Sequence, residues 1–545
     1  MKDSYDVVIV GAGVNGLACG AYLAKAGLEV AVIEKRNECG PFALTEDIFG
    51  AGVPVDTHAG VCFLPMSPAW GDLDLSSFGF EMIFPEVSGA TVWPDKNLIY
   101  YTFNREKNSE SIGRYSQKDA KTYLRIAGQI APRVQEMVER GVFTAPSPEG
   151  EDYLFSLGSA VGFSPRDLRT MNGMELLDLL YENEYVRTSL LGMANIGVFG
   201  DPAEKGEGAV MTLLGWGLGI GVPKGGMHNL VHALVRCFRH HGGTLMLNAP
   251  VAKVTWAAGR PDGVVLEEDS AFGPREIKAR KAVVMHTSPP IALKMLGNDE
   301  VARGDGELQR KMNYWDMTGH CAFTSYFLLK EPAHWGSASW NRDIMKCPYP
   351  VRAWDSWDHA ARSLQYTRNE ELFVVAADVA EMYNLAAVDP SRRSPDGKCA
   401  MVFEIEYPVN LRRYGGIQAW DNREITDQLH ENHLGQIEAL APGFRELVLA
   451  SSYSTPLDNW RRNPSAIYGH ELGGDVSGAQ WYMGRMPNRS RIAGLYFSNG
   501  VWPGSLTHLA TGYITACCVA EDLGVRKQEW WCHHPFDQIA SHLGG

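Results

Sequence analysis

The sequence is poor in positive charge and has no long hydrophobic run. Its 545 residues carry 50 lysines and arginines against 64 aspartates and glutamates, a formal charge of −14 at pH 7. Without a basic excess the chain does not attract nucleic-acid phosphates or anionic lipid, so we expect no nucleic-acid partner. No apolar run approaches the ~20 residues that a membrane-spanning helix needs. We expect a cytoplasmic protein, with peripheral contact with a membrane left open.

Motifs for metal, disulfide and nucleophile chemistry are also lacking. The ten cysteines are scattered, with only Cys517 and Cys518 adjacent and no C-x-x-C pair. Neither a zinc site nor a disulfide framework is therefore indicated, and we expect no metal. The N-terminus enters a predicted strand almost at once, which leaves no room for a signal peptide. No G-x-S-x-G elbow supports a nucleophilic triad.

A dinucleotide-binding pattern runs from the start of the chain to Glu34. An apolar run at Val7–Val10 predicts a buried parallel strand, and a second one follows at Val30–Ile33. Between them the spacing G-x-G-x-x-G is made by Gly11, Gly13 and Gly16. These glycines permit a tight turn, close approach of a pyrophosphate, and close packing of helix on strand. Amide groups at the helix start would face the phosphates. Glu34, directly after the second strand, is placed to bind a ribose hydroxyl.

The length of the chain predicts more than one domain. We predict an α/β fold: a discontinuous Rossmann-type FAD-binding domain interleaved with a mixed α+β substrate domain. The FAD-binding segments are 1–105, 223–310 and 485–525, the substrate segments are 106–222 and 311–484, and 526–545 is a packed C-terminal extension.

Hydrophobic spacing places the main elements along the chain. We predict helices over 116–141, 173–194, 228–240 and 422–440, and strands over 245–247, 263–285, 323–329, 400–407 and 492–497, with a last helix after the glycine turn near residue 500. The apolar stretch Val210–Val222 has four glycines. We interpret it as a buried strand or glycine-packed helix, with a wall of a lipophilic channel as the alternative.

Four segments resemble the phytoene desaturase family of FAD-dependent oxidoreductases, which is related to the flavin amine oxidases. They are the N-terminal fingerprint, the loop with Thr45-Glu46 and Asp56, the PKGGM segment at 223–227, and GLYFSNGVWPG at 494–504. The resemblance spans nearly the whole chain and implies an enzyme that uses FAD.

The resemblance also implies which residues hold FAD. The adenosine end would lie on the first strand and helix, the adenine would meet the strand at Val251, and the C-terminal turn would hold the ribityl chain and flavin. The predicted cofactor residues are Gly11, Gly13, Val14, Asn15, Gly16, Glu34, Lys35, Gly40, Thr45, Val251, Gly500, Gly504 and Leu506. The chain departs from the family pattern at Pro41, Asn499 and Trp502.

Few residues are candidates for chemistry, because dehydrogenation by a flavin asks the protein mainly for orientation and sometimes a base. The resemblance places His58 and His508 near the flavin, and they are the candidates for proton transfer, with packing as the alternative. Trp502 and Tyr513 are candidate substrate walls. We expect His320 to be a core histidine, with a place facing the cavity from the other domain as the alternative.

Four functions stay open. The first is a dehydrogenase or desaturase that passes a hydride from a lipophilic, isoprenoid or terpenoid-like molecule to flavin N5. The second is a redox-neutral isomerase or a saturase that uses reduced FAD, and the third is an amine oxidase, which would form peroxide from amines in air. The fourth is a non-catalytic binding member that keeps the fold. The electron acceptor and the oligomeric state are left open.

Overall fold

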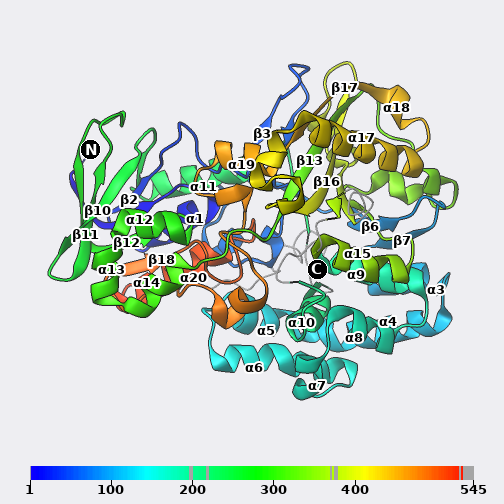
Figure 1. Ribbon diagram of the computed structural model, residues 1–545, viewed down its shortest axis with the longest axis horizontal. Helices are drawn as coiled ribbons and strands as arrows, with labels where there is room; N and C mark the ends of the chain where they lie inside the picture. The colour runs from blue at the N-terminus through cyan, green and yellow to red at the C-terminus, as the bar shows by residue number, and fades with distance from the viewer. Residues whose placement is uncertain are drawn as a thin grey trace.

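The computed structural model describes residues 2–195, 201–215, 220–368, 371–372, 379–526 and 529–531. Two seven-stranded sheets form its two halves, with a block of helices beneath the second (Figure 1). This mixture of parallel sheet, antiparallel sheet and helices confirms the predicted α/β class.

The first sheet contains the predicted nucleotide-binding strands. Its strands are β1 (Ser4–Val10), β2 (Val30–Ile33), β9 (Thr244–Met246), β10 (Val251–Ala257), β11 (Arg260–Leu266), β12 (Glu276–Met285) and β18 (Leu495–Phe497). β12, β1, β2 and β9 are adjacent and parallel, β18 joins β12, and β10 and β11 extend the edge in antiparallel pairing. All four residues of β2 are buried, as expected for a parallel strand covered on both faces.

Three helices pack together against this sheet: α1 (Val14–Lys25), α11 (His228–His240) and α20 (Ala510–Asp522). Two glycines of α1 let this helix lie close to the glycine turn and to β2. A Cβ built on Gly16 would lie 2.4 Å from the Gly11 carbonyl oxygen, and one on Gly20 would lie 2.9 Å from Val32 Cγ2. The packing role predicted for the third glycine of the motif is therefore confirmed.

The second sheet is largely antiparallel. Its strands are β6 (Gly89–Val92), β7 (Leu98–Tyr101), β13 (His320–Leu329), β14 (Pro350–Arg352), β15 (Ala380–Tyr383), β16 (Cys399–Pro408) and β17 (Val448–Ser454), in the order β17-β13-β16-β15-β14-β6-β7. Helix α17 (Arg423–Leu440) covers one face, where His433 contacts the hydroxyl groups of Ser325 and Tyr407. Because side chains alternate along a strand, Thr324 and Glu404 point to the opposite face.

Helices between the strands of the second sheet form the block at the bottom of Figure 1. They are α3 (Arg105–Gly113), α4 (Gln117–Ile130), α5 (Val134–Met137), a π-helix (Val138–Val142), α6 (Pro148–Ser156), α7 (Pro165–Thr170), α8 (Gly173–Leu180), α9 (Glu184–Asn195) and α10 (Glu207–Leu214). The predicted helix over 116–141 is thus broken into shorter pieces, where Pro132 interrupts the α-helical hydrogen bonds. The stretch from Val210 begins as buried helix in α10, and residues 216–219 lie outside the described ones.

The remaining elements are short. They are α2 (Ala69–Asp72), β3 (Thr45–Glu46), β4 (Val55–Asp56), β5 (Met82–Ile83), β8 (Val222–Pro223), α12 (Pro289–Leu296), α13 (Asn298–Gly304), α14 (Gly306–Asn313), α15 (Trp357–Arg368), α18 (Phe444–Leu447) and α19 (Pro456–Arg462). In the C-terminal extension the rings of Trp530 and Trp531 pack at a tilt against Tyr22 of α1, while residues 527–528 and 532–545 lie outside the described ones.

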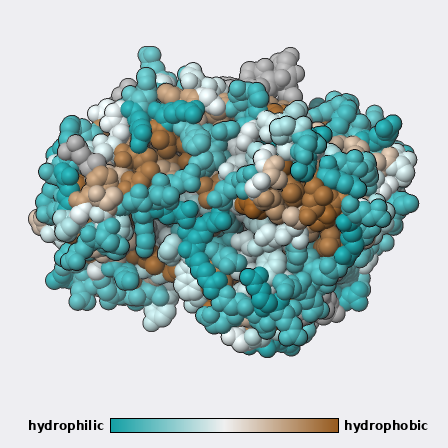
Figure 2. Space-filling view, turned by 90° about the horizontal axis from the view of Figure 1, so that it is seen from above, coloured by the Kyte–Doolittle hydropathy of each residue, from teal (hydrophilic) through white to brown (hydrophobic). Residues whose placement is uncertain are grey.

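The predicted domain boundaries stay a prediction. β6 and β7, which we expected in the first FAD-binding segment, hydrogen-bond with β14 in the second sheet. Among the described residues no helix is long and apolar enough to cross a membrane. The face shown in Figure 2 is mostly hydrophilic, with two hydrophobic areas, one on each half.

Candidate functional site

Two cavities meet at the glycine turn after β1. The first runs beside Gly11, Glu34 and Lys35 to Val251, and the second runs beside Val14, Asn15 and Gly40 to Leu506. Both are lined by Gly13, Pro41, His286, Asn463 and Asn499. Together they extend from Val251 past the start of α1 to Leu506. An elongated ligand that places its diphosphate at the glycine turn fits this space.

The carboxylate of Glu34 fixes the turn. Its Oε2 accepts a hydrogen bond from the amide of Ala12 at 2.8 Å, and its Oε1 accepts one from the amide of Arg36 at 2.9 Å. Burial raises the pKa of Glu34, although these amide bonds oppose the shift. The residue predicted to contact a ribose thus lines the first cavity and also supports the glycine turn; the ribose contact stays a prediction.

His286, at the end of β12, is a site residue that the sequence reasoning missed. Its Nδ1 lies 2.9 Å from Ser498 Oγ and 3.1 Å from the Ser498 carbonyl oxygen, while Nε2 faces the glycine turn. A Cβ added to Gly13 would lie 2.6 Å from that Nε2. Burial lowers the pKa of His286 to about 4, so the imidazole is neutral at pH 7. The feature that could have indicated His286 as a site residue is its place at the carboxyl end of a parallel strand next to β1.

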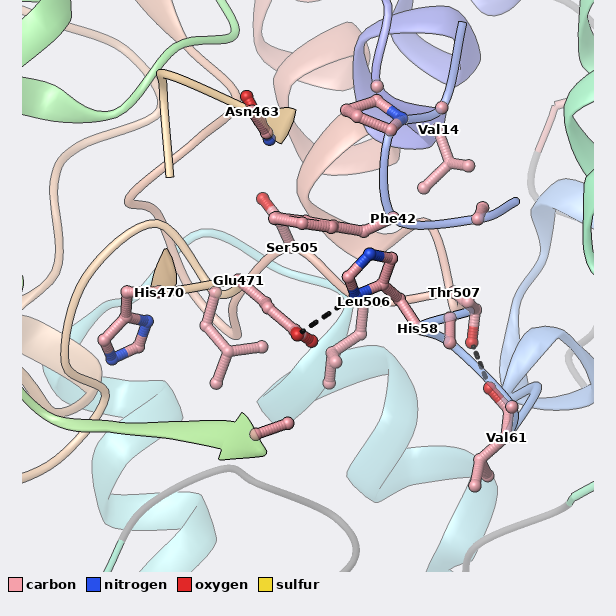
Figure 3. Close-up of a pocket in the computed structure, with 18 of the residues that line it drawn as sticks. Val14, Phe42, His58, Val61, Asn463, His470, Glu471, Ser505, Leu506 and Thr507 are labelled. Carbon is pink, nitrogen blue, oxygen red and sulfur yellow. Dashed lines mark hydrogen bonds and ion pairs between the residues drawn. The ribbon is translucent and has the colours of Figure 1, made fainter. Parts of the chain in front are cut away.

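Asn15 joins α1 to the C-terminal segment beside the second cavity. Its Nδ2 donates to the Leu506 carbonyl oxygen at 3.1 Å, and its Oδ1 accepts from the Gly512 amide at 3.2 Å. Two segments from opposite ends of the sequence therefore meet at one wall. Leu506 and Val14 point into the cavity from this wall (Figure 3).

Several polar atoms on the cavity walls fit a polar ligand. Asn499 Oδ1, Ser505 Oγ and Thr287 Oγ1 are buried and have no hydrogen-bond partner among the described residues. Asn499 lines both cavities, Ser505 the second and Thr287 the first. Buried polar groups normally have partners, so atoms left unpaired along one continuous cavity are what an FAD molecule would satisfy.

Thr45 lies in a buried network rather than on the cavity wall. Its hydroxyl donates to Asp56 Oδ1 at 2.6 Å and accepts from the His228 amide at 3.1 Å. Asp56 also accepts from the Met227 amide and pairs with Arg392, whose Nη1 lies 2.7 Å from Asp56 Oδ2. The network therefore holds the start of α11 against β3 and β4. Arg392 carries no sequence pattern that would have indicated this role.

His58 lies at the far end of the second cavity, below Phe42 in Figure 3. Its ring is 4.8 Å from that of Phe42, and Glu471 Oε1 lies 3.8 Å from its Nδ1. Burial, with a smaller effect of Arg462, lowers the pKa of His58 to about 3. A neutral imidazole with so low a proton affinity is a weak base, so the structure gives the predicted proton-transfer role little support.

Acidic residues surround this end of the cavity. Glu381, Glu404, Glu406 and Glu471 all line it, as does His320. The expectation that His320 is a core histidine is wrong, because its side chain is exposed at the cavity. No sequence pattern indicated this cluster, since its members come from β15, β16 and the segment after α19.

The remaining predicted residues do not line either cavity. His508 is buried, its Nδ1 accepts from the Ala510 amide at 3.0 Å, and burial lowers its pKa to about 3. Trp502 is buried with its indole N–H donating to the Gly141 carbonyl at 2.7 Å, and Tyr513 packs on Tyr22. Gly500 and Gly504 take positive φ angles in the turn before α20. Their predicted contacts with flavin or substrate stay predictions.

Among the described residues, no group of three or more histidine, cysteine, aspartate or glutamate side chains is arranged to hold a metal ion.

Comparisons with known proteins agree with this site. The family described as "Flavin containing amine oxidoreductase" matches residues 15–328. The chain is 22% identical to a limonene dehydrogenase subunit of Castellaniella defragrans over 99% of this chain and 98% of that protein. It is 27% identical to hydroxyneurosporene desaturase of Cereibacter sphaeroides, over 48% of this chain and 53% of that protein. A crystal structure of a putrescine oxidase variant has the same fold, with a TM-score of 0.59 at 17% identity over 96% of this chain and 99% of that one.

The family match covers more than half of the chain, and the cavity at the glycine turn fits the cofactor of that family. The predicted resemblance and the predicted cofactor are confirmed. The chain belongs to the flavin-containing amine oxidoreductase family and is an FAD-dependent oxidoreductase.

Proposed function

We propose that this oxidoreductase is a dehydrogenase or desaturase that removes a hydride from a lipophilic, isoprenoid or terpenoid-like substrate. The observation that carries the proposal is an apolar chamber next to the second cavity. The two spaces share Val61, Glu381 and Tyr383 as walls. A substrate can therefore keep a hydrocarbon body in the chamber while its reacting carbon lies in the cavity.

The chamber is lined mainly by aromatic and aliphatic side chains. They include Tyr101, Phe103, Tyr123, Leu190, Met193, Ile220 and Tyr349. Planar and branched apolar surfaces of this kind suit an alkene or a ring. The names of two relatives, the limonene dehydrogenase subunit and hydroxyneurosporene desaturase, are consistent with a terpenoid or carotenoid substrate.

The roles of the residues follow from their places. Gly11, Gly13, Glu34 and Val251 would hold the adenosine and diphosphate end of FAD, and Asn15, Gly40 and Leu506 would hold the end that bears the flavin. Bound FAD supplies the hydride acceptor. The chamber would orient the substrate and exclude water from the reacting carbon.

The test is anaerobic mixing of the FAD-loaded protein with limonene while the visible flavin band is recorded. We expect the band to bleach, because hydride transfer reduces the flavin. A Met193→Trp variant, which fills the chamber, should require more limonene for the same bleaching and keep its FAD. Leu179→Trp is the control, because Leu179 is 64% exposed on α8.

An amine oxidase is the second candidate, and the acidic end of the cavity favours it, because a cationic amine would pair with a carboxyl group there that has lost its proton. Bleaching by cyclohexylamine but not by limonene, with peroxide formed in air, would establish it. Conversion of limonene only after the FAD has been reduced, with no net electron flow, would instead indicate the isomerase or saturase.

A further inference from the structure

Four carboxyl groups line the second cavity, and one of them, that of Glu381, also lines the chamber. Glu381 comes from β15, Glu404 and Glu406 from β16, and Glu471 from the segment after α19. We call these four residues the acid cluster. They reach the cavity from three separate segments, so local sequence does not explain why they meet.

The members of the acid cluster differ in their hydrogen bonds and in their exposure. Glu404 accepts from the Thr324 hydroxyl at 2.7 Å, and the Tyr383 hydroxyl lies 3.2 Å from Glu404 and 3.0 Å from Glu381. Glu471 instead keeps 33% of its side chain exposed, facing the cavity that it lines. Glu404 and Glu381 are thus held by the protein, while Glu406 and Glu471 are presented to a ligand. Of these two, Glu471 lies beside His58, with its Oε1 3.8 Å from His58 Nδ1.

His58, which is buried, lines the same part of the second cavity as Glu471. The His58 side chain is 1% exposed, and neither of its ring nitrogens has a hydrogen-bond partner among the described residues. Figure 3 shows its ring in the cavity with the Glu471 carboxyl group directed toward it. A buried polar ring left without a hydrogen bond indicates that a further group belongs in this space.

The cavity walls shield the carboxyl groups of the cluster from bulk water and so raise their pKa values. This shielding raises the pKa of Glu471 to about 7. The same shielding and the charge of Glu471 raise the pKa values of Glu404 and Glu406 to about 8, and it raises the pKa of Glu381 well above its usual value. A carboxyl group with a pKa near 7 exchanges protons readily at the pH of the cell, whereas His58 stays neutral.

We propose that Glu471 accepts the proton that the substrate releases. This inference rests on the proposed dehydrogenation. Bound FAD would take one hydrogen of the substrate together with its bonding electron pair, as hydride. The neighbouring C–H bond breaks with its proton carried to a Glu471 carboxyl oxygen, and its electron pair forms the C=C bond.

Titratable groups that interact with Glu471 or line the same end of the cavity come from several segments. They are His58 after β4, His320, Cys321 and Tyr326 on β13, Glu381 and Tyr383 on β15, Glu404 and Glu406 on β16, and His470 beside Glu471. Two cationic groups act on His58: Arg462, which pairs with Glu46 at 2.9 Å, and Arg36.

The test uses the FAD-loaded protein without substrate and measures the flavin midpoint potential as a function of pH, with a chemical reductant and redox dyes. Reduction adds electrons to the cavity and raises the proton affinity of a nearby carboxyl group. We expect the slope of potential against pH to change near pH 7 in the natural protein and to show no such change in Glu471→Gln. Two controls should keep the change of slope near pH 7. They are Glu404→Gln, an equivalent change in the same cluster, and Glu446→Gln on the surface of α18.

A change of slope that persists in Glu471→Gln, or is lost only in Glu404→Gln, overturns the proposal. If Glu471→Gln does not retain FAD, Glu471→Asp serves instead. In that variant the slope should change at a different pH from the natural protein. A change of slope at the same pH contradicts the proposed role of Glu471. Failure of limonene to bleach the flavin, with the slope change lost in Glu471→Gln, refutes the proposed substrate and supports the role of Glu471.

Discussion

At the scale of single residues, Gly13 gives the sharpest test of where the cofactor lies. Even a methyl group on Gly13 would meet His286 Nε2 at 2.6 Å, so Gly13→Ala must displace the imidazole in the wall of the cavity that would hold the diphosphate. We expect this variant to lose most of its bound FAD, measured by the flavin absorbance per protein after purification.

Gly128→Ala is the matched control for Gly13→Ala. Gly128 lies in α4, and a Cβ there would have no atom within 4 Å. Alanine favours a helix more than glycine does, so this variant should keep its FAD and its stability. Normal FAD content in Gly13→Ala would refute the placement of the diphosphate.

Glu404 links the acid cluster to the pH dependence of stability. Its pKa is raised to about 8 in the folded protein, so folding retains a proton there that the unfolded chain loses above pH 4.5. The stabilising contribution of this retained proton is fully present below pH 4.5 and disappears as the pH rises toward 8. The folded protein should therefore become less stable from pH 5 to 8, by at most about 1.4 kcal/mol per pH unit for this group.

Glu404→Gln should flatten that dependence, because the amide can still accept from Thr324 and carries no charge. The measurement is the urea midpoint at several pH values between 5 and 8, with Glu446→Gln as the control. Equal pH dependence in the natural protein and in Glu404→Gln would contradict the raised pKa.

At the scale of elements, the ion pair of Arg392 and Asp56 holds α11 against β3 and β4. Both side chains are at most 2% exposed, and Arg392 also donates to the Pro223 carbonyl oxygen at 3.0 Å. Arg392→Met leaves a carboxylate buried without its partner, which typically costs about 3–5 kcal/mol. We expect a loss of that size in the free energy of unfolding. Arg393→Met, at the exposed neighbouring position, should cost clearly less.

The elements that were predicted well are those whose signals are local. β1, the glycine turn, α1 and β2 follow one another directly along the chain, and the predicted second strand has the bounds Val30–Ile33 that the structure shows. Helix α11 has its predicted bounds for the same reason, since its apolar face repeats at helical spacing.

Features that depend on distant partners were not predictable from one sequence. His286 meets Gly13 only because β12 pairs with β1, and the acid cluster forms only because β15 and β16 are neighbours. β6 and β7 were placed with the nucleotide-binding part because they follow it in sequence, whereas β6 pairs with β14, which comes far later in the chain. Strand pairing of this kind is set by burial across the whole sheet and not by local pattern.

At the scale of the whole molecule, the cofactor cavity touches both halves. Gly13 and His286 belong to the first sheet and its connecting turns, while His320 and Glu404 belong to the second, and all four line the same space. A ligand that binds only the folded state stabilises it by about 2.7 kcal/mol when its concentration is 100 times Kd. Because FAD would contact walls from both sheets, we expect it to stabilise both.

Hydrogen exchange of the FAD-loaded and FAD-free proteins measures this directly. Peptides from β1 and β12 should exchange more slowly with FAD bound, and so should peptides from β13 and β16. The helices α6 and α7 provide an internal control, because none of their residues lines either cavity. Protection confined to the first sheet would mean that the cofactor ends before the acid cluster, which would place Glu471 too far from the flavin to take a proton during the reaction.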